Sequence, residues 1–244
     1  MTKTTNAILE ALQQVDAERA RRDADPGLHE RVLALKHYQQ ERFARTYADL
    51  LAQDRYAPAA RFFLDELYGP RDYRARDAQF ARVVPALVRL FPDDVVHTVR
   101  ALSLLHALSE SLDSAMGQVL ASTAVDASEY VRAWQACGRE RDRDRQIDLT
   151  LEVARALDGY TRNPWLRNSL RMMRGPARVA GLSELQGFLE SGFDTFRGMR
   201  GAQVFLDAIE QRERALAARL FDKDAVTCVT GPSRSADAAL GQLP

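Results

Sequence analysis

Apolar residues recur every three or four positions along almost the whole chain, which is the spacing of one face of an α-helix. Runs in which apolar and polar residues alternate, as they do in strands, are missing from the sequence. The pattern predicts an all-α protein, built as a single-domain array of about eight helices. A chain of 244 residues with 46% hydrophobic content is long enough to bury a large core.

Local signals indicate where helices begin. Asp25 and Pro26 supply a cap and a first-turn proline, and Asp126 with Glu129 forms a D-x-x-E capping box. The helical domain is expected to span residues 1–221 in three parts: an N-terminal hairpin over about 5–54, helices over about 57–121, and C-terminal helices over about 126–221.

The last stretch, DKDAVTCVTGPSRSADAALGQLP, differs in character from the rest of the chain. It contains few large apolar residues and shows no sustained helical spacing. With little surface to bury, residues 222–244 are expected to form a disordered tail.

The stretch RFFLDELYGPRDYRARD, residues 61–77, predicts a helix that ends in a sharp corner. Gly69 sits where a left-handed residue ends a helix, and Pro70 prevents the helix from continuing. The helix presents a broad apolar side, formed by two pairs of residues one turn apart: Phe63 with Leu67, and Leu64 with Tyr68.

The same corner carries charges that could serve a ligand. Arg71 could hold a carboxylate or phosphate, and Asp72 is placed to cap the following helix, so these two residues form a candidate turn site. The simpler interpretation is a structural corner, because neighbouring acids such as Asp65 and Glu66 could pair with the arginines instead.

The segment from Tyr56 to Leu120, and above all FFLDELYGPRD, resembles a family of all-helical bacterial proteins with an FFLxxLYGPRD signature. The resemblance extends toward LQGFLESGFDTFRGMRGAQVFLDAIEQRE near the C-terminus. It implies a bacterial, helical and intact domain. Because that family is uncharacterised, the resemblance implies no activity, cofactor, partner or functional residue.

Charge is balanced over the chain, with 34 Lys and Arg against 34 Asp and Glu. There is no global field that would attract nucleic acid or an anionic membrane, so we expect neither as a partner. Cys137 and Cys228 match no metal-ligand or redox spacing. No secretory signal is recognisable, and no run approaches the roughly 20 apolar residues of a membrane span, so a cytoplasmic location is expected.

The strongest local imbalance of charge lies in residues 159–181, where five arginines meet no acid. Arg167, Arg171 and Arg174 follow one another at helical spacing and form a stripe on one face. Such a stripe could contact an anionic group on a small ligand or on another protein, whereas three arginines make a weak footprint for nucleic acid. Alternatively, the stripe pairs within the molecule, with Asp93 and Asp94 or with Glu110 and Asp113.

A second cluster lies in the most apolar predicted helix. His106, Glu110 and Asp113 share one face and form a possible half of a metal site. Helical-bundle carboxylate centres need matching motifs on other helices, and no second motif of that kind is present. The simpler interpretation is a solvated face with a histidine near two acids, so no metal is expected.

Gly187 and Gly192 lie inside an otherwise periodic helix, where each glycine costs about 1 kcal/mol relative to alanine. Close approach of another helix is the simpler compensation, and an apolar pocket for a flat ligand is the alternative. The aromatic residues around them are also those of an ordinary core.

Together these patterns favour a cytoplasmic interaction or ligand-binding protein with an arginine-rich contact face. The alternative is a helical enzyme, or a cofactor- or metal-binding protein, with its site between the helix over 182–198 and the helix that carries His106. The sequence specifies no cofactor and leaves open whether the protein is an enzyme. A partner could be another protein, a small anionic ligand, or a second copy of the chain.

Overall fold

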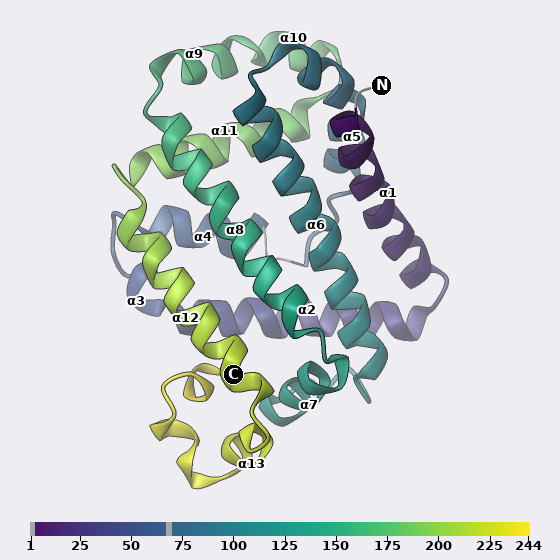
Figure 1. The fold of residues 1–244 in the computed structure, drawn as a ribbon, viewed down its shortest axis with the longest axis vertical. Coiled ribbons are helices and arrows are strands. Elements are labelled where there is room, and N and C mark those ends of the chain that lie inside the picture. Colours follow the sequence, from purple (N-terminus) through teal and green to yellow (C-terminus); the bar gives the residue numbers. More distant parts are fainter. Residues whose placement is uncertain (1–2, 67–69) are drawn as a thin grey trace.

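The computed structural model describes residues 3–66 and 70–244, and within these ranges the chain contains helices and no strand (Figure 1). The all-α class expected from the sequence is confirmed. None of the described helices combines the length and apolar character needed to cross a bilayer. The helices are α1 (Lys3–Asp23), α2 (Pro26–Thr46), α3 (Ala48–Leu51), α4 (Ala57–Glu66), α5 (Arg74–Leu90), α6 (Asp93–Val119), α7 (Ala127–Cys137), α8 (Glu140–Thr161), α9 (Pro164–Met172), α10 (Arg174–Val179), α11 (Ser183–Gly198), α12 (Gln203–Phe221) and α13 (Ala225–Thr230), with 3₁₀ turns η1 (Pro232–Ala236) and η2 (Leu240–Gln242).

The prediction of about eight helices is too low, because some predicted helices are interrupted. The helix that begins at Pro26 stops at Tyr47, where the backbone leaves helical geometry (φ −115°, ψ 24°), and the short α3 follows. Tyr47 is fully buried and its hydroxyl donates a hydrogen bond to Glu213 (2.8 Å). A second interruption at Met173 separates α9 from α10.

Four long helices stand side by side in the order α1, α6, α8 and α12, and each contacts the next (Figure 1). Behind them α2 crosses near one end of the molecule and α11 crosses nearer the other end. Helices α4 and α5 belong to the same rear layer, where both contact α11. Helices α9 and α10 cover the end next to α11, whereas α7 and α13 cover the opposite end (Figure 1).

The helix starts follow the local signals in the sequence. Asp25 caps α2 by accepting a hydrogen bond from the backbone N–H of Leu28 (3.0 Å). Asp126 caps α7 in the same way through the N–H of Glu129 (2.8 Å). The Glu129 carboxylate accepts from the N–H of Ala121 (2.8 Å), so Glu129 fastens the preceding loop rather than completing the predicted box.

The core consists mainly of two aromatic clusters, one near α11 and one near α7. The cluster near α11 joins side chains from the front and rear layers, and the cluster near α7 lies under the C-terminal segment. The first includes Phe43, Phe63, Phe196 and Phe205, and the second includes Tyr38, Met116, Tyr130, Trp134 and Leu220.

Two glycines mark close approaches between helices. A Cβ atom at Gly117 of α6 would lie 2.4 Å from Cγ2 of Val32, so α2 and α6 pack with no room for a side chain. At Gly192 of α11 a Cβ atom would lie 3.2 Å from Cζ of Phe62 on α4, as close helix packing requires. Gly187 has open space around its Cα, so packing explains only one of the two glycines in α11.

The expectation of a disordered tail is wrong for residues 222–244. This segment forms α13, η1 and η2, and it buries Ala225, Leu240 and Leu243 completely. Arg234 donates hydrogen bonds to the backbone carbonyls of Leu243 and Pro244, which closes the segment on itself. A few apolar side chains suffice here because they cover an existing core instead of forming a new one.

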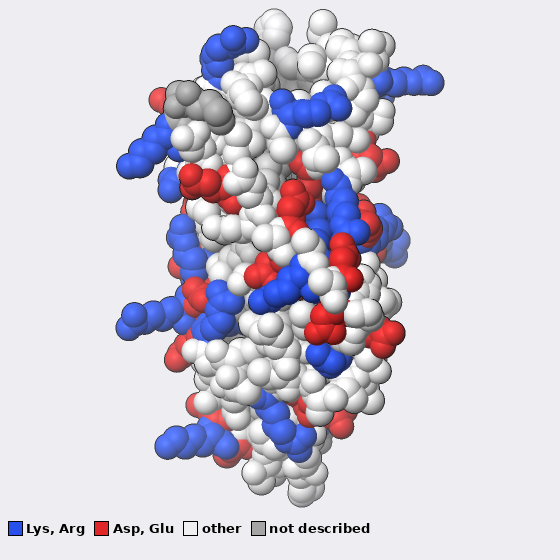
Figure 2. Space-filling model, turned by 90° about the vertical axis from the view of Figure 1, so that its right-hand side faces the viewer, with Lys and Arg blue, Asp and Glu red and all other residues white. Residues whose placement is uncertain are grey.

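Charges of both signs are interspersed on the side of the molecule shown in Figure 2. Charged side chains of the described residues often form ion pairs, such as Arg74 with Asp23 (2.7 Å). No large surface of one sign covers this face, which agrees with the balanced composition.

Candidate functional site

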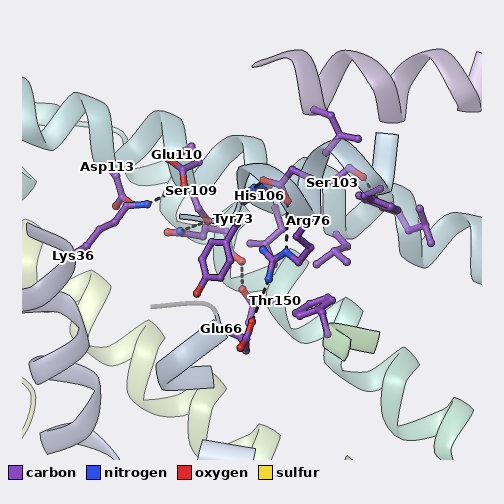
Figure 3. Close-up of a pocket in the computed structure, with 18 of the residues that line it drawn as sticks. Lys36, Glu66, Tyr73, Arg76, Ser103, His106, Ser109, Glu110, Asp113 and Thr150 are labelled. Atoms are coloured by element: carbon purple, nitrogen blue, oxygen red, sulfur yellow. Dashed lines mark hydrogen bonds and ion pairs between the residues drawn. The ribbon is translucent and has the colours of Figure 1, made fainter. Parts of the chain in front are cut away.

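A cavity of about 220 Å³ lies between the front helices α6 and α8 and the rear helices α2, α5 and α11 (Figure 3). Helix α6 lines it with one continuous stripe of residues at intervals of three or four: Val99, Leu102, His106, Ser109 and Asp113. At 1.5 Å per residue this stripe is about 21 Å long. It is apolar at the Val99 end and charged at the Asp113 end.

The apolar end of the cavity is enclosed by α5 and α11. Apart from Arg76 and Asp77 in the middle of the cavity, the residues that these two helices contribute carry no ionisable side chain. These apolar residues are Phe80, Val83 and Leu87 from α5, and Leu185, Phe188 and Leu189 from α11.

The middle of the cavity holds a histidine paired with a carboxylate. His106 of α6 lies with Nε2 2.7 Å from Oδ2 of Asp77 on α5, and Arg19 of α1 lies 2.7 Å from the same oxygen. Burial opposes ionisation of Asp77, but His106 and Arg19 outweigh it and lower the pKa of Asp77. Asp77 is therefore a carboxylate that accepts both hydrogen bonds.

The stretch around the predicted corner also borders the middle of the cavity. Arg76 pairs with Glu66 (3.3 Å) and lies over the rings of Tyr73 (4.0 Å) and Phe188 (4.4 Å), as Figure 3 shows for the first two partners. The Tyr73 hydroxyl donates to the backbone carbonyl of Asp65 (2.6 Å). The aromatic and charged residues of this segment thus form a cavity wall.

The charged end begins with Glu110, which pairs with Arg22 of α1 and with Lys36 of α2 (2.8 Å; Figure 3). Burial would raise the pKa of Glu110, yet Lys36 and Arg22 prevail and lower it to about 2. Asp113, one turn further, lies 3.6 Å from Lys36 and accepts a hydrogen bond from Gln39 (3.3 Å). Burial raises the pKa of Asp113, because Lys36, Arg143 and the Gln39 hydrogen bond do not compensate for the lost hydration.

Arg143 of α8 completes the charged end and differs from the other cations there. It is only 5% exposed, donates to Gln146 (3.2 Å) and to the sulfur of Met116 (2.9 Å), and lies over the Trp134 ring (4.0 Å). None of the ion pairs among the described residues includes it. Burial lowers the pKa of Arg143, and Asp113 acts on it only through space.

Each acid among the described residues that line the cavity forms an ion pair with a cation other than Arg143. Glu66 pairs with Arg76, Asp77 with Arg19, Glu213 with Arg42, and Glu110 and Asp113 with Lys36. Within the described parts of the chain, Arg143 is thus the lining cation left without a carboxylate. A buried guanidinium in this state is costly unless an anion reaches it.

The predicted arginine stripe lies elsewhere, on the outer surface at the α9 and α10 end. Arg167 and Arg171 lie 3.2 and 4.0 Å from Asp194, and Arg174 lies 2.5–2.8 Å from Glu190. The stripe is paired internally, but with α11 and not with Asp93, Asp94, Glu110 or Asp113. Its arginines stay partly exposed beside these acids.

The candidate turn site lies on the surface close to the cavity wall. Arg71 is exposed and pairs with Glu66 (3.3 Å), and Asp72 accepts a hydrogen bond from the N–H of Arg74 (2.9 Å) at the start of α5. Neither residue lines the cavity. The predicted roles of Leu67, Tyr68 and Gly69 lie outside the described residues.

The structure does not bring His106, Glu110 and Asp113 together. His106 contacts Asp77, whereas Glu110 and Asp113 contact Lys36. No group of three metal-ligating side chains gathers among the described residues. The expectation of a solvated face is wrong, because Glu110 is 4% exposed and Asp113 is 8% exposed.

Sequence patterns missed Arg143 and the pair formed by His106 with Asp77. Arg143 lies in the run RERDRDRQ, which looks like a solvated charged segment. The helical register of Arg143 could have indicated its burial, because Arg143 shares a helix face with Ile147 and the buried Ala154. Asp77 and His106 are 29 residues apart on different helices, so no local pattern joins them.

Comparison with known proteins gives one finding. A family model described as Domain of unknown function (DUF8198) matches residues 18–227, and this range includes all the cavity residues named above. No curated protein and no solved structure matches the chain.

Proposed function

The chain belongs to this family of unknown function, and we propose that it binds a small molecule with an anionic group in the internal cavity. The observation that carries the proposal is Arg143, a buried cation that lines the cavity and has no carboxylate partner among the residues that the structure describes. A carboxylate or phosphate of the ligand would supply the missing charge and two parallel acceptors.

Neighbouring donors support an anionic partner at this place. The Trp134 indole N–H is buried and has no hydrogen-bond acceptor among the described residues. Tyr130 also lines the cavity, and burial raises the pKa of its hydroxyl, which stays protonated and able to donate. Buried donors are normally satisfied, so the unpartnered N–H of Trp134, whose ring lies under Arg143, favours a bound acceptor nearby.

Native mass spectrometry of the freshly purified protein, followed by titration with small carboxylates and phosphates, tests this function. We expect a bound anionic molecule in the wild type and its loss in Arg143→Met. Arg178→Gln, an exposed arginine on α10 outside the cavity, is the matched control and should bind as the wild type does. Equal binding by Arg143→Met and the wild type, or no binding of any anion by the wild type, would contradict the proposal.

A second candidate is an enzyme that uses the same cavity, which His106 and Asp77 favour. With Nε2–H donated to the Asp77 carboxylate, a neutral imidazole keeps its other nitrogen as a proton acceptor. His106→Gln should then retain the bound molecule and abolish its conversion, followed by mass. Unchanged conversion in this variant would exclude His106 from the chemistry.

A further inference from the structure

The polarity of the cavity changes along its length in one direction. Helices α6 and α8 run antiparallel, because Thr98 contacts Tyr160 (2.9 Å) at one end while Arg139 donates to Ser111 (2.9 Å) at the other. Arg143 therefore lies at the Asp113 end of the α6 stripe, about 21 Å from the Val99 end. The unpaired cation and the apolar wall are thus at opposite ends of one cavity.

From this arrangement we infer that the ligand is an acidic amphiphile, with its anionic group at Arg143 and its apolar chain between α5 and α11. The inference rests on the proposed function and adds the chemical class of the ligand. Phe80 and Phe188 are among the side chains that would cover the apolar chain. Each methylene group of the ligand that this apolar wall removes from water increases the affinity of the ligand for the protein.

The middle of the cavity is polar, yet it does not oppose an apolar chain. Ser103 donates to the carbonyl of Val99 (2.9 Å), and Thr150 donates to the carbonyl of Gln146 (2.8 Å). Ser109 accepts from the Gln146 amide (2.8 Å), and His106 donates to Asp77. Because the donors of Ser103, Thr150, Gln146 and His106 already have acceptors, a hydrocarbon chain can cross these four groups without leaving their donors unsatisfied.

A series of straight-chain carboxylates tests the ligand class by isothermal titration calorimetry. Acetate, hexanoate, decanoate and tetradecanoate present one head group with increasing apolar length, and the longest chain spans the distance from Arg143 to the apolar wall. We expect affinity to rise most steeply once the chain reaches this wall, by up to about fourfold per methylene. Tetradecanamide, which lacks the charge, should bind at least about tenfold more weakly than tetradecanoate.

Variants at the two ends separate the contributions of head and chain. Arg143→Met should weaken all carboxylates by a similar factor, whereas Leu102→Asn should weaken tetradecanoate and leave acetate nearly unchanged. Val204→Asn, on the exposed part of α12, is the matched control for the apolar position and should bind like the wild type. Circular dichroism verifies folding, and the tetradecanamide comparison on the wild type tests the head group without any substitution.

The outcomes distinguish the two proposals. Carboxylates that bind through Arg143 with no dependence on length would overturn the amphiphile and leave the proposed function standing. Equal affinities for tetradecanoate and tetradecanamide would overturn the placement of the anionic group at Arg143. Absence of binding by every carboxylate and phosphate would remove both.

Discussion

At the scale of single residues, the buried carboxylate of Glu110 makes the stability of the fold depend on pH. Glu110 has its pKa lowered from 4.5 to about 2, so its ionised form stabilises the fold above pH 4.5. We expect this contribution, on the order of 3 kcal/mol, to be lost as the pH falls from about 4.5 toward 2.

Urea denaturation of wild type and Glu110→Gln across this pH range measures the effect. The difference between the two proteins should shrink toward acid pH, because protonated Glu110 is as neutral as the glutamine that replaces it. A difference that stays constant from pH 5 to pH 2 would show that Glu110 is not held ionised by Arg22 and Lys36.

Gly117 shows how tightly α2 and α6 are packed. In Gly117→Ala the new Cβ would meet Val32 at 2.4 Å, so overpacking should cost about 1–3 kcal/mol, of which helix propensity returns about 1 kcal/mol. Gly187→Ala is the matched control, because open space surrounds that glycine and the substitution should stabilise α11. Urea denaturation compares them, and stabilisation by both would argue against close packing at Gly117.

At the scale of helices, the sequence predicted what is local and missed what joins distant segments. Asp25 and Asp126 cap the helices that they were expected to cap, since an N-cap needs only the next three residues. The burial of Glu110 depends on α1 and α2 covering its face of α6, which no pattern within α6 can indicate. A local imbalance of charge singles out the arginines of α9 and α10, but their ion pairs with Asp194 and Glu190 on α11 balance that charge in the fold.

The arginines of α9 and α10 remain a predicted contact surface for an anionic partner. Their pairs with Asp194 and Glu190 are exposed, and exposed pairs typically contribute about 0–1 kcal/mol. Arg171→Glu should therefore leave the unfolding temperature nearly unchanged and abolish partner binding, measured by co-purification. A partner retained by this variant would show that the stripe is not a contact surface.

At the scale of the whole molecule, the C-terminal segment closes the end of the fold beside α7. Leu240 is fully buried against the cluster that contains Trp134, so Leu240→Ala should lower the free energy of unfolding by about 2–5 kcal/mol. Thermal or urea denaturation measures this loss, with the exposed Val204→Ala as control. A loss below about 0.5 kcal/mol would instead favour the disordered tail that the composition of residues 222–244 predicts.

The family match ends at residue 227, before Leu240 and Leu243. These residues pack in the cluster that includes Trp134, and Trp134 carries the guanidinium of Arg143 on its ring. The segment beyond the matched range therefore belongs to the core cluster that holds Trp134 in place under Arg143.

The unpaired Arg143 also has a consequence for the life of the protein in a cell. A molecule that carries an uncompensated buried charge is the less stable form, and an anion that neutralises it adds its binding free energy to folding. Chains that lack ligand would open more often and be degraded sooner. The amount of this protein would then follow the supply of its ligand, without any dedicated regulator.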